Sequence, residues 1–176
     1  MKEIEVKVLG VDKKKIIEII SRFGAKKTFE GQIETTFFDF ADVRISKAKG
    51  ILRLRKAGEK SLLTFKTILS QESAKEAEEF EVVVSDLQIM KKILKALGLS
   101  ETGKILKHRI SFSLGNVHFD LDTYENELSY VPPYLEIEAE NIDLIYKYAE
   151  LLGHRIKDCL PWSTEDVINY YSTKSK

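Results

Sequence analysis

Charged residues recur in pairs, two positions apart, inside six apolar segments of this 176-residue sequence. A β-strand has a side-chain period of two, so the members of a pair share one face and the intervening apolar residues share the other. The first segment shows this alternation most fully, with Glu3, Glu5 and Lys7 set between apolar residues. The other pairs are Arg53/Arg55, Glu79/Glu81, Lys107/Arg109, Asp120/Asp122 and Glu136/Glu138. The chain is therefore expected to form strands with one charged face each.

Three of these strands are followed by segments with the pattern of amphipathic helices. Each helical segment starts at a residue suited to capping a helix and stops at a glycine, which suits the position after a helix end. An apolar helix face must cover a sheet, and the apolar strand faces are its natural counterpart. The expected helices run from Asp12 to Gly24, from Ser85 or Asp86 to Gly98, and from Asn141 to Gly153.

The remaining segments are expected to connect these units. Residues 26–40 are extended, residues 62–67 return after a hairpin turn, and residues 68–76 are polar and predicted to be a loop. A last short helix is predicted to start at Ser163, because an acidic residue, Asp166, follows it by three positions.

Composition limits the function classes. Lys and Arg together number 28, as do Asp and Glu, so the chain has no net charge to attract nucleic acid or a membrane surface. The single cysteine, Cys159, excludes an internal disulfide and favours a reducing compartment. No apolar run approaches the roughly 20 residues that span a bilayer, and no leader segment is visible. We therefore expect one cytoplasmic domain over residues 1–176, a monomer or a homodimer, with neither nucleic acid nor membrane as partner.

The charged faces leave two architectures open. In an open sheet these faces meet solvent and have no functional meaning. If about eight antiparallel strands close into a barrel, the same faces line its lumen, where charges need water, one another or a ligand. The lumen would then contain Lys7, Arg53, Arg55, Lys66, Lys107 and Arg109 together with Glu3, Glu5, Glu79, Glu81, Asp122, Glu136 and Glu138.

A phosphate chain with divalent cations meets the needs of such a lumen. Arginine and lysine grip phosphate oxygens, and carboxylates hold Mg²⁺ or Mn²⁺ that also touches the phosphates. The sequence has no glycine-rich run ending in Gly-Lys-Ser or Gly-Lys-Thr, so a P-loop is excluded.

The first charged segment, Glu3-Ile-Glu5-Val-Lys7, resembles the ExExK signature of the CYTH superfamily. This superfamily comprises class IV adenylyl cyclases and thiamine-triphosphatase-like enzymes, also called triphosphate tunnel metalloenzymes. Nearly the whole chain follows the family's order. The matching segments are Gln32–Asp39, Asp42–Arg44, Lys47–Gly50, Leu52–Arg55, Thr64–Lys66, Glu79–Glu81, Lys107–Arg109, Asp122 and Leu135–Glu138. Two segments depart from the family's pattern: Phe40-Ala41 replace a frequent Thr-Pro, and the connector Glu125–Pro133 is long.

The resemblance implies an α+β fold, in which a closed eight-stranded antiparallel β-barrel forms a tunnel and the helices pack outside. It implies a triphosphate-containing partner such as ATP or tripolyphosphate, with Mg²⁺ or Mn²⁺ as cofactor. The implied phosphate-binding residues are Lys7, Arg53, Arg55, Lys66, Lys107 and Arg109. The implied metal-binding residues are Glu3, Glu5, Glu136 and Glu138, supported by Glu81 and Asp122. Glu5 and Lys7 are the candidate catalytic residues.

Three functions remain open at this point. The first is a metal-dependent triphosphatase that hydrolyses an inorganic or organic triphosphate. The second is a class IV adenylate cyclase that converts ATP into cyclic AMP and pyrophosphate. Both need in-line positioning and neutralised charge, so both use the same residue types. The third is a polyphosphate- or nucleotide-binding module without turnover.

Overall fold

The structure is a computed structural model that describes residues 2–174. Its strands are β1 (Lys2–Leu9), β2 (Lys26–Phe40), β3 (Gly50–Ala57), β4 (Lys60–Gln71), β5 (Lys75–Val83), β6 (Leu99–Leu114), β7 (Val117–Tyr124) and β8 (Tyr134–Ala139). Its helices are α1 (Lys13–Arg22), α2 (Arg44–Lys47), α3 (Leu87–Ala96), α4 (Ile142–Leu151) and α5 (Thr164–Lys174), with short 3₁₀ turns at Asn126–Leu128 and Ile156–Asp158. Met1, which begins the first expected strand segment, lies outside the described residues.

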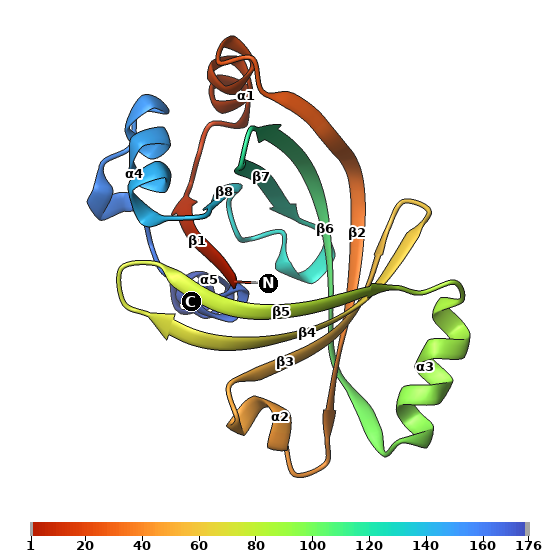
Figure 1. The fold of residues 1–176 in the computed structure, drawn as a ribbon. Helices are drawn as coiled ribbons and strands as arrows, with labels where there is room; N and C mark the ends of the chain where they lie inside the picture. Colours follow the sequence, from red (N-terminus) through yellow and green to blue (C-terminus); the bar gives the residue numbers. More distant parts are fainter. Residues whose placement is uncertain (1, 175–176) are drawn as a thin grey trace.

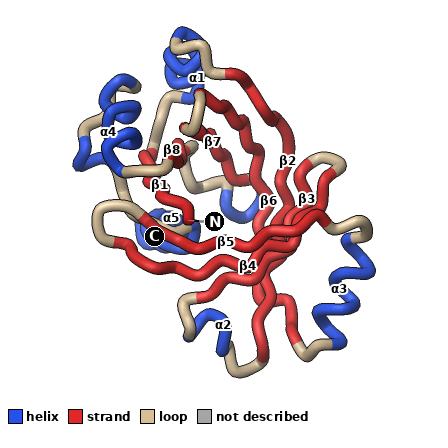
Figure 2. The backbone as a smooth tube through the Cα atoms, in the orientation of Figure 1, coloured by secondary structure: helices blue, strands red, loops and turns tan. Residues whose placement is uncertain are grey.

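The eight strands close into an antiparallel barrel in the order β1-β5-β4-β3-β2-β6-β7-β8. β1 closes the ring, because Glu3 lies opposite Ala77 of β5 and Glu5 lies opposite Glu138 of β8. Helices α1, α2, α3 and α4 lie outside the ring of strands, whereas α5 is seen through the ring, between β1 and β5 (Figures 1 and 2). The closed eight-stranded barrel implied by the family resemblance is therefore confirmed, and the open sheet does not form.

The expected helix boundaries are also confirmed. Asp12 accepts hydrogen bonds from the backbone N–H groups of Lys14 and Lys15, and Asp86 and Asn141 cap α3 and α4 in the same way. Gly24, Gly98 and Gly153 follow the three helices with φ between 79° and 90°, a conformation that costs other residues energy. At α5, Ser163 and Asp166 exchange hydrogen bonds as a reciprocal capping pair.

The main core lies between the outer face of the barrel and two helices. Val6 and Ile137, which face away from the lumen, pack with Ile16 and Ile20 of α1 and Ile145 of α4. A second core cluster joins Leu87, Met90 and Leu94 of α3 to Leu54 and Phe38 on the far side of the barrel. Helices therefore cover the apolar strand faces and leave the charged faces inside.

Two expectations need correction. Residues 68–76 are not a loop: β4 continues to Gln71 and β5 begins at Lys75, with a register shift between Ile68 and Ser70 that keeps this polar stretch in the sheet. The apolar face of a helix is expected to cover a sheet, but Ile89 and Ile93 of α3 and its C-cap residue Leu97 are largely exposed. Only the side of α3 with Leu87, Met90 and Leu94 packs on the barrel.

No helix among residues 2–174 has the length and apolar character needed to cross a membrane.

Candidate active site

The charged strand faces enclose a cavity of about 330 Å³ inside the barrel. All the expected lumen residues lie in or directly behind its wall. Lys7 and Asp122 are deepest, being 1% and 0% exposed. Those that line the cavity are Glu3, Glu5, Arg53, Arg55, Lys66, Glu79, Glu81, Lys107, Arg109, Glu136 and Glu138, together with Lys75, His118 and Asp120.

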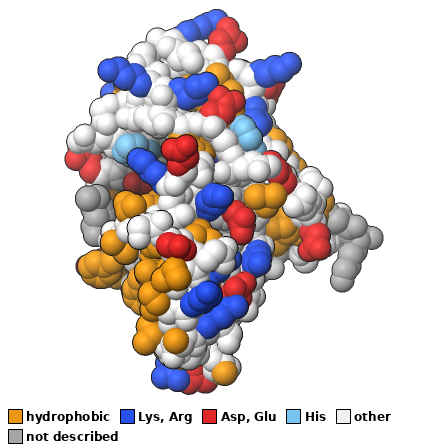
Figure 3. Space-filling view, turned by 90° about the vertical axis from the view of Figure 1, so that its right-hand side faces the viewer, with side chains coloured by type: hydrophobic (Ala, Val, Ile, Leu, Met, Phe, Trp, Pro, Cys, Tyr) orange, Lys and Arg blue, Asp and Glu red, His pale blue; other side chains and the backbone are white. Residues whose placement is uncertain are grey.

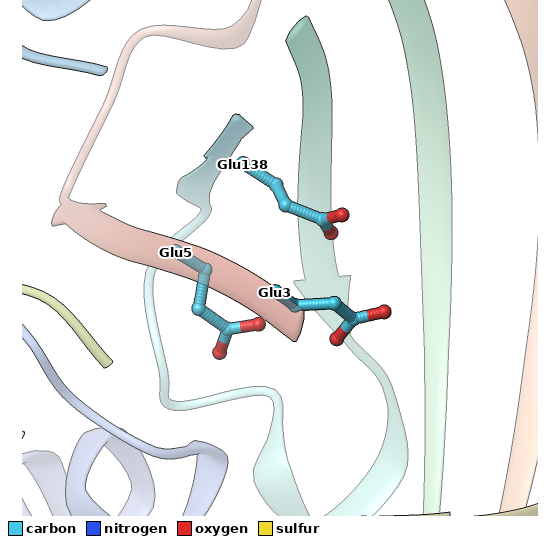
Figure 4. A group of neighbouring side chains, drawn as sticks. All are labelled: Glu3, Glu5 and Glu138. Atoms are coloured by element: carbon cyan, nitrogen blue, oxygen red, sulfur yellow. The ribbon is translucent and has the colours of Figure 1, made fainter. Parts of the chain in front are cut away.

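Three carboxylates converge on one side of the lumen. Glu3 and Glu5 extend from β1 and Glu138 extends from the adjacent β8, all toward the barrel interior (Figure 4). One oxygen from each lies within 4.8 Å of the others. Burial, together with the neighbouring carboxylates Glu3, Glu136 and Glu5, raises the pKa of Glu138 to about 8. A divalent cation would relieve this crowding and prefers carboxylate oxygens, so the three residues fit a Mg²⁺ or Mn²⁺ site.

Lys7 holds the carboxylates of Glu5 and Glu136 in place from behind. Its Nζ lies 2.8 Å from Glu5 Oε1 and 2.9 Å from Glu136 Oε2. Burial lowers the pKa of Lys7, but Glu136 and Glu5 outweigh this effect and raise it above its ordinary value. Lys7 is therefore a fixed cation whose position in the wall orients Glu5 toward the lumen.

Two more lysines reach the carboxylates from β5, which lies next to β1 in the barrel, and from β4, which follows β5. Lys66 Nζ of β4 lies 2.6 Å from Glu3 Oε2 and 2.9 Å from Glu79 Oε2. Lys75 Nζ of β5 lies 2.8 Å from Glu5 Oε1. Burial and Glu136 raise the pKa of Glu5, but the three ammonium groups around it lower that pKa to about 2. Glu5 is thus ionised and ready to bind a cation.

Lys75 was missed in the sequence because it lies in the stretch expected to be a loop. A usable signal was present: Lys75 has the same parity as Glu79 and Glu81, so extending the alternation backwards along β5 would have placed it in the lumen.

Asp122 anchors the cations of the neighbouring strand. Its Oδ2 accepts a hydrogen bond of 2.6 Å from Lys107 Nζ, and its Oδ1 accepts one of 2.7 Å from Arg109 Nε. Arg109 also pairs with Asp120 through Nη1. This arrangement follows from the register, which sets Arg109 directly opposite Asp122. The structure therefore brings Asp122 to Lys107 and Arg109 rather than to the converging carboxylates.

Glu136 and Glu81 likewise have partners outside the carboxylate cluster. Glu136 pairs with Lys7, and Glu81 accepts a hydrogen bond of 2.9 Å from the Thr64 hydroxyl. The metal-binding roles expected for these two residues and for Asp122 remain predictions.

Arg53 and Arg55 have the fewest compensating partners in the lumen. The Nε atoms of both are buried and have no hydrogen-bond partner among residues 2–174. Arg53 Nη2 lies 3.4 Å from Glu79, a long contact. Burial, with Arg53 and Arg109 close by, lowers the pKa of Arg55 to about 10. Burying guanidinium N–H groups without an acceptor costs free energy. An anion bound on this side of the lumen would supply the acceptors, so this side suits an anionic ligand.

A second cavity, of about 510 Å³, adjoins the first and has a different lining. Arg53, Lys66 and Lys75 line both cavities, which places the two side by side. The remaining wall is largely apolar and includes the first turns of α5. Its apolar members are Phe37, Phe38, Ile51, Leu52, Ile68, Ile105, Leu128 and Ile168. The charged lumen therefore continues into a space suited to an organic group.

Comparison with known proteins identifies relatives of this chain. It is 28% identical over 144 residues to a protein of Methanocaldococcus jannaschii named as a candidate adenylate cyclase, covering 82% of this chain and 80% of that protein. A solved structure from Pyrococcus horikoshii OT3 matches with a TM-score of 0.79 and 30% identity, covering 95% of this chain and 99% of the other.

A more distant structure has the same fold. The Hippeastrum protein, described as a candidate adenylyl cyclase with a dominant triphosphatase activity, matches with a TM-score of 0.70 and 16% identity over 96% of this chain and 95% of its own. The family model of the CYTH domain matches residues 1–158. The ordered charges of the barrel and this match over most of the chain lead to one assignment: the protein is a member of the CYTH domain family.

Proposed function

We propose that this protein is a metal-dependent enzyme that hydrolyses an organic triphosphate, with the phosphate chain in the charged lumen. The observation that carries this proposal is that the buried Nε atoms of Arg53 and Arg55 have no hydrogen-bond partner among residues 2–174, on the wall of a cavity that also holds three converging carboxylates. Anionic oxygens supply the missing acceptors for the arginines, and a divalent cation satisfies the carboxylates. A phosphate chain with its metal provides both at once.

The lumen residues then have separate tasks. Arg53, Arg55, Lys107 and Arg109 bind phosphate oxygens, and Asp122 fixes the last two in position. Glu3, Glu5 and Glu138 would hold the divalent cation, which neutralises charge on the phosphates when it is bound. Lys7 and Lys75 orient Glu5 from behind and from the side. Positioning and charge stabilisation of this kind account for most of the catalysis in phosphoryl transfer.

The apolar cavity favours an organic substrate over inorganic tripolyphosphate. Tripolyphosphate has no group to place against Ile51, Ile105 and Ile168, whereas a nucleoside triphosphate or a similar ester does. Hydrolysis is the simpler reaction in this space, because it requires only water as the nucleophile.

Adenylate cyclase activity is the second candidate, favoured by the name of the Methanocaldococcus relative. In that reaction the ribose 3′-oxygen attacks the α-phosphorus and pyrophosphate leaves. The same cations would stabilise this transition state, since charge again develops on phosphate oxygens.

Product analysis separates these functions. The protein would be incubated with ATP or with tripolyphosphate in the presence of Mg²⁺ or Mn²⁺. Orthophosphate from ATP supports the triphosphatase, cyclic AMP with pyrophosphate supports the cyclase, and binding without any product reduces the protein to a binding module.

Two variants on α5 test the role of the apolar cavity. Ile168→Trp, which fills the cavity, should lower kcat/KM for ATP by at least about tenfold and leave tripolyphosphate turnover unchanged. Asn169→Trp, an exposed neighbour on the same helix, serves as the control. An equal loss for both substrates in the Ile168 variant would contradict an organic-group site.

A further inference from the structure

Lys75 is a buried lysine with a single carboxylate partner. Lysine and arginine side chains lie at the surface on the face shown in Figure 3, but Lys75 is only 5% exposed. Its Nζ lies 2.8 Å from Glu5 Oε1, and this is the only hydrogen bond or ion pair of that ammonium group with residues 2–174. Lys7 Nζ also lies 2.8 Å from this oxygen, but Lys7 pairs with Glu136 as well. Lys75 therefore shares its one partner with another cation.

The ammonium group of Lys75 has hydrogen-bond donors that residues 2–174 leave unused. An ammonium group has three N–H donors, and Glu5 accepts one of them. Burying the other two without acceptors costs free energy. The oxygen atoms of an anion in the adjoining cavity would supply these acceptors. Lys75 is therefore suited to bind an anionic ligand directly, in addition to orienting Glu5.

Lys75 lies where the charged lumen meets the apolar cavity. It lines both spaces, as do Arg53, Lys66 and Thr164. The other cations that line the lumen do not line the apolar cavity; they are Arg55, Lys107 and Arg109. A substrate with its organic part in the apolar cavity and its phosphates in the lumen must cross this junction. The group at the junction is then the phosphate that carries the ester bond.

We propose that Lys75 binds the ester phosphate of the substrate, which is the phosphate group joined to its organic part. This inference rests on the function proposed above and fixes the direction of the phosphate chain. With the ester phosphate at Lys75, the other two phosphates extend toward Arg55 and Arg109. Glu3 and Glu138 line the lumen but not the apolar cavity, so a cation held there would lie along these two phosphates. Cleavage of the terminal phosphate then leaves the ester phosphate in the diphosphate product.

Lys7 provides a comparison that separates phosphate binding from the orientation of Glu5. The ammonium groups of Lys7 and Lys75 both lie 2.8 Å from Glu5 Oε1, so the loss of either one disturbs that carboxylate. Lys7 lines neither cavity, whereas Lys75 lines both. If Lys75 only orients Glu5, variants of the two lysines should bind a ligand similarly. If Lys75 binds the ester phosphate, its variant should bind the ligand more weakly.

Calorimetric titration of ADP in the presence of a chelator tests the proposal, because ADP carries an organic part and the ester phosphate. Lys75→Met should raise the Kd of ADP at least about tenfold, since charge-assisted hydrogen bonds are lost. The variant should remain folded, because Glu5 keeps Lys7 and Lys66 as partners, and its melting temperature checks this. Lys7→Met should weaken ADP binding less. Lys14→Met, at an exposed lysine of α1, should bind ADP like the wild type.

Three results of this titration would overturn the proposal: no ADP binding by the wild type, wild-type ADP binding by Lys75→Met, or equal weakening in Lys7→Met and Lys75→Met.

Kinetics separate this inference from the proposed function. With ATP and saturating Mn²⁺, Lys75→Met should raise KM about tenfold and affect kcat much less, because the contact is the same in the ground state and the transition state. A loss confined to kcat would place Lys75 at the reacting phosphate and overturn the proposal. A wild type that binds ADP but does not cleave ATP would contradict the triphosphatase, while the ADP titrations would still decide the role of Lys75.

Discussion

Single residues in the lumen carry charges that serve different purposes. Lys7 and Asp122 are buried in the wall and hold other charged groups in place. Arg53 and Arg55 keep guanidinium N–H groups without a partner among the described residues. A buried charge that is fully paired holds its neighbours in a fixed position. A buried charge that lacks partners lowers the stability of the folded protein unless a ligand supplies them. The lumen thus contains both charges that are paired with one another and buried guanidinium N–H groups that lack an acceptor.

Arg55 gives the sharpest test at this scale. Arg55→Ala should lower kcat for triphosphate cleavage by about 10²–10³, because a positioned cation is lost in the transition state. Its unfolding free energy should stay unchanged or rise, since burial and the nearby Arg53 and Arg109 disfavour the charge and lower its pKa to about 10. Arg55→Lys should also reduce activity, because the planar bidentate group is lost.

Turnover and melting temperature of the Arg55 variants are the measurements, with Lys14→Ala on α1 as the control. An Arg55→Ala enzyme with wild-type turnover would contradict the assignment of phosphate binding to this residue.

At the scale of elements, the four-residue helix α2 depends on one carboxylate from β2. Asp39 accepts hydrogen bonds from the backbone N–H groups of Ile45 and Ser46 and from the Ser46 hydroxyl, at 2.7–3.0 Å. α2 is too short to be stable on its own, so these bonds fix it at the mouth of the apolar cavity, which Ser46 lines. Helix α2 is therefore held in place by hydrogen bonds to a side chain of another element, β2.

Replacing this carboxylate should destabilise the protein in a pH-dependent way. Asp39→Ala should lower the unfolding free energy by about 1–3 kcal/mol at neutral pH, because several donors lose their acceptor. Burial raises the pKa of Asp39, but the bonds from Ser46, Ile45 and Phe40 outweigh it and lower the pKa to about 2. A lowered pKa means that the stabilisation is complete above the ordinary value of 3.8 and disappears as the pH falls toward 2.

Urea unfolding of wild type and Asp39→Ala between pH 6 and pH 2 tests this. The difference between the two proteins should shrink over the acid end of the range. A difference that stays constant with pH would show that the ionised carboxylate is not the stabilising form.

The odd or even position of a residue along its strand, here called its parity, explains how far the sequence predicts the site. A period of two places Arg53 with Arg55 and Glu3 with Glu5 on one face each, and this suffices to predict the lumen once the barrel closes. Parity does not give the register between strands. The pairing of Asp122 with Arg109, and the approach of Lys75 to Glu5, depend on which residues lie opposite one another across strands distant in sequence. For this reason the sequence does not give the ion-pair partners of Asp122 or the contact of Lys75 with Glu5.

At the scale of the whole molecule, the carboxylate cluster links metal binding to stability. Mg²⁺ or Mn²⁺ alone should raise the melting temperature, because a ligand that binds only the folded state stabilises it by about 2.7 kcal/mol at 100 times its Kd. Glu138→Gln should raise the stability of the metal-free protein, since burial and like charges disfavour the ionised Glu138. The same variant should lose most of the metal-induced gain.

Thermal melts with and without Mn²⁺, reversed by a chelator, provide the measurement. Glu140→Gln, an exposed position just after β8, is the control and should keep the full metal response. An undiminished response in Glu138→Gln would remove this residue from the metal site.

The closure of the barrel by β1 also determines when the site can exist during synthesis. β1 precedes the other seven strands in the sequence, yet its two neighbours are β5 and β8, and β8 ends only at Ala139. The edge of β1 that pairs with β8 therefore remains unpaired until the chain has been synthesised as far as Ala139. Glu3, Glu5 and Lys7 lie on this strand. Pairings this distant in sequence form slowly, and exposed strand edges are prone to association. The alternating charges of β1 disfavour the association of this unpaired strand with other nascent chains.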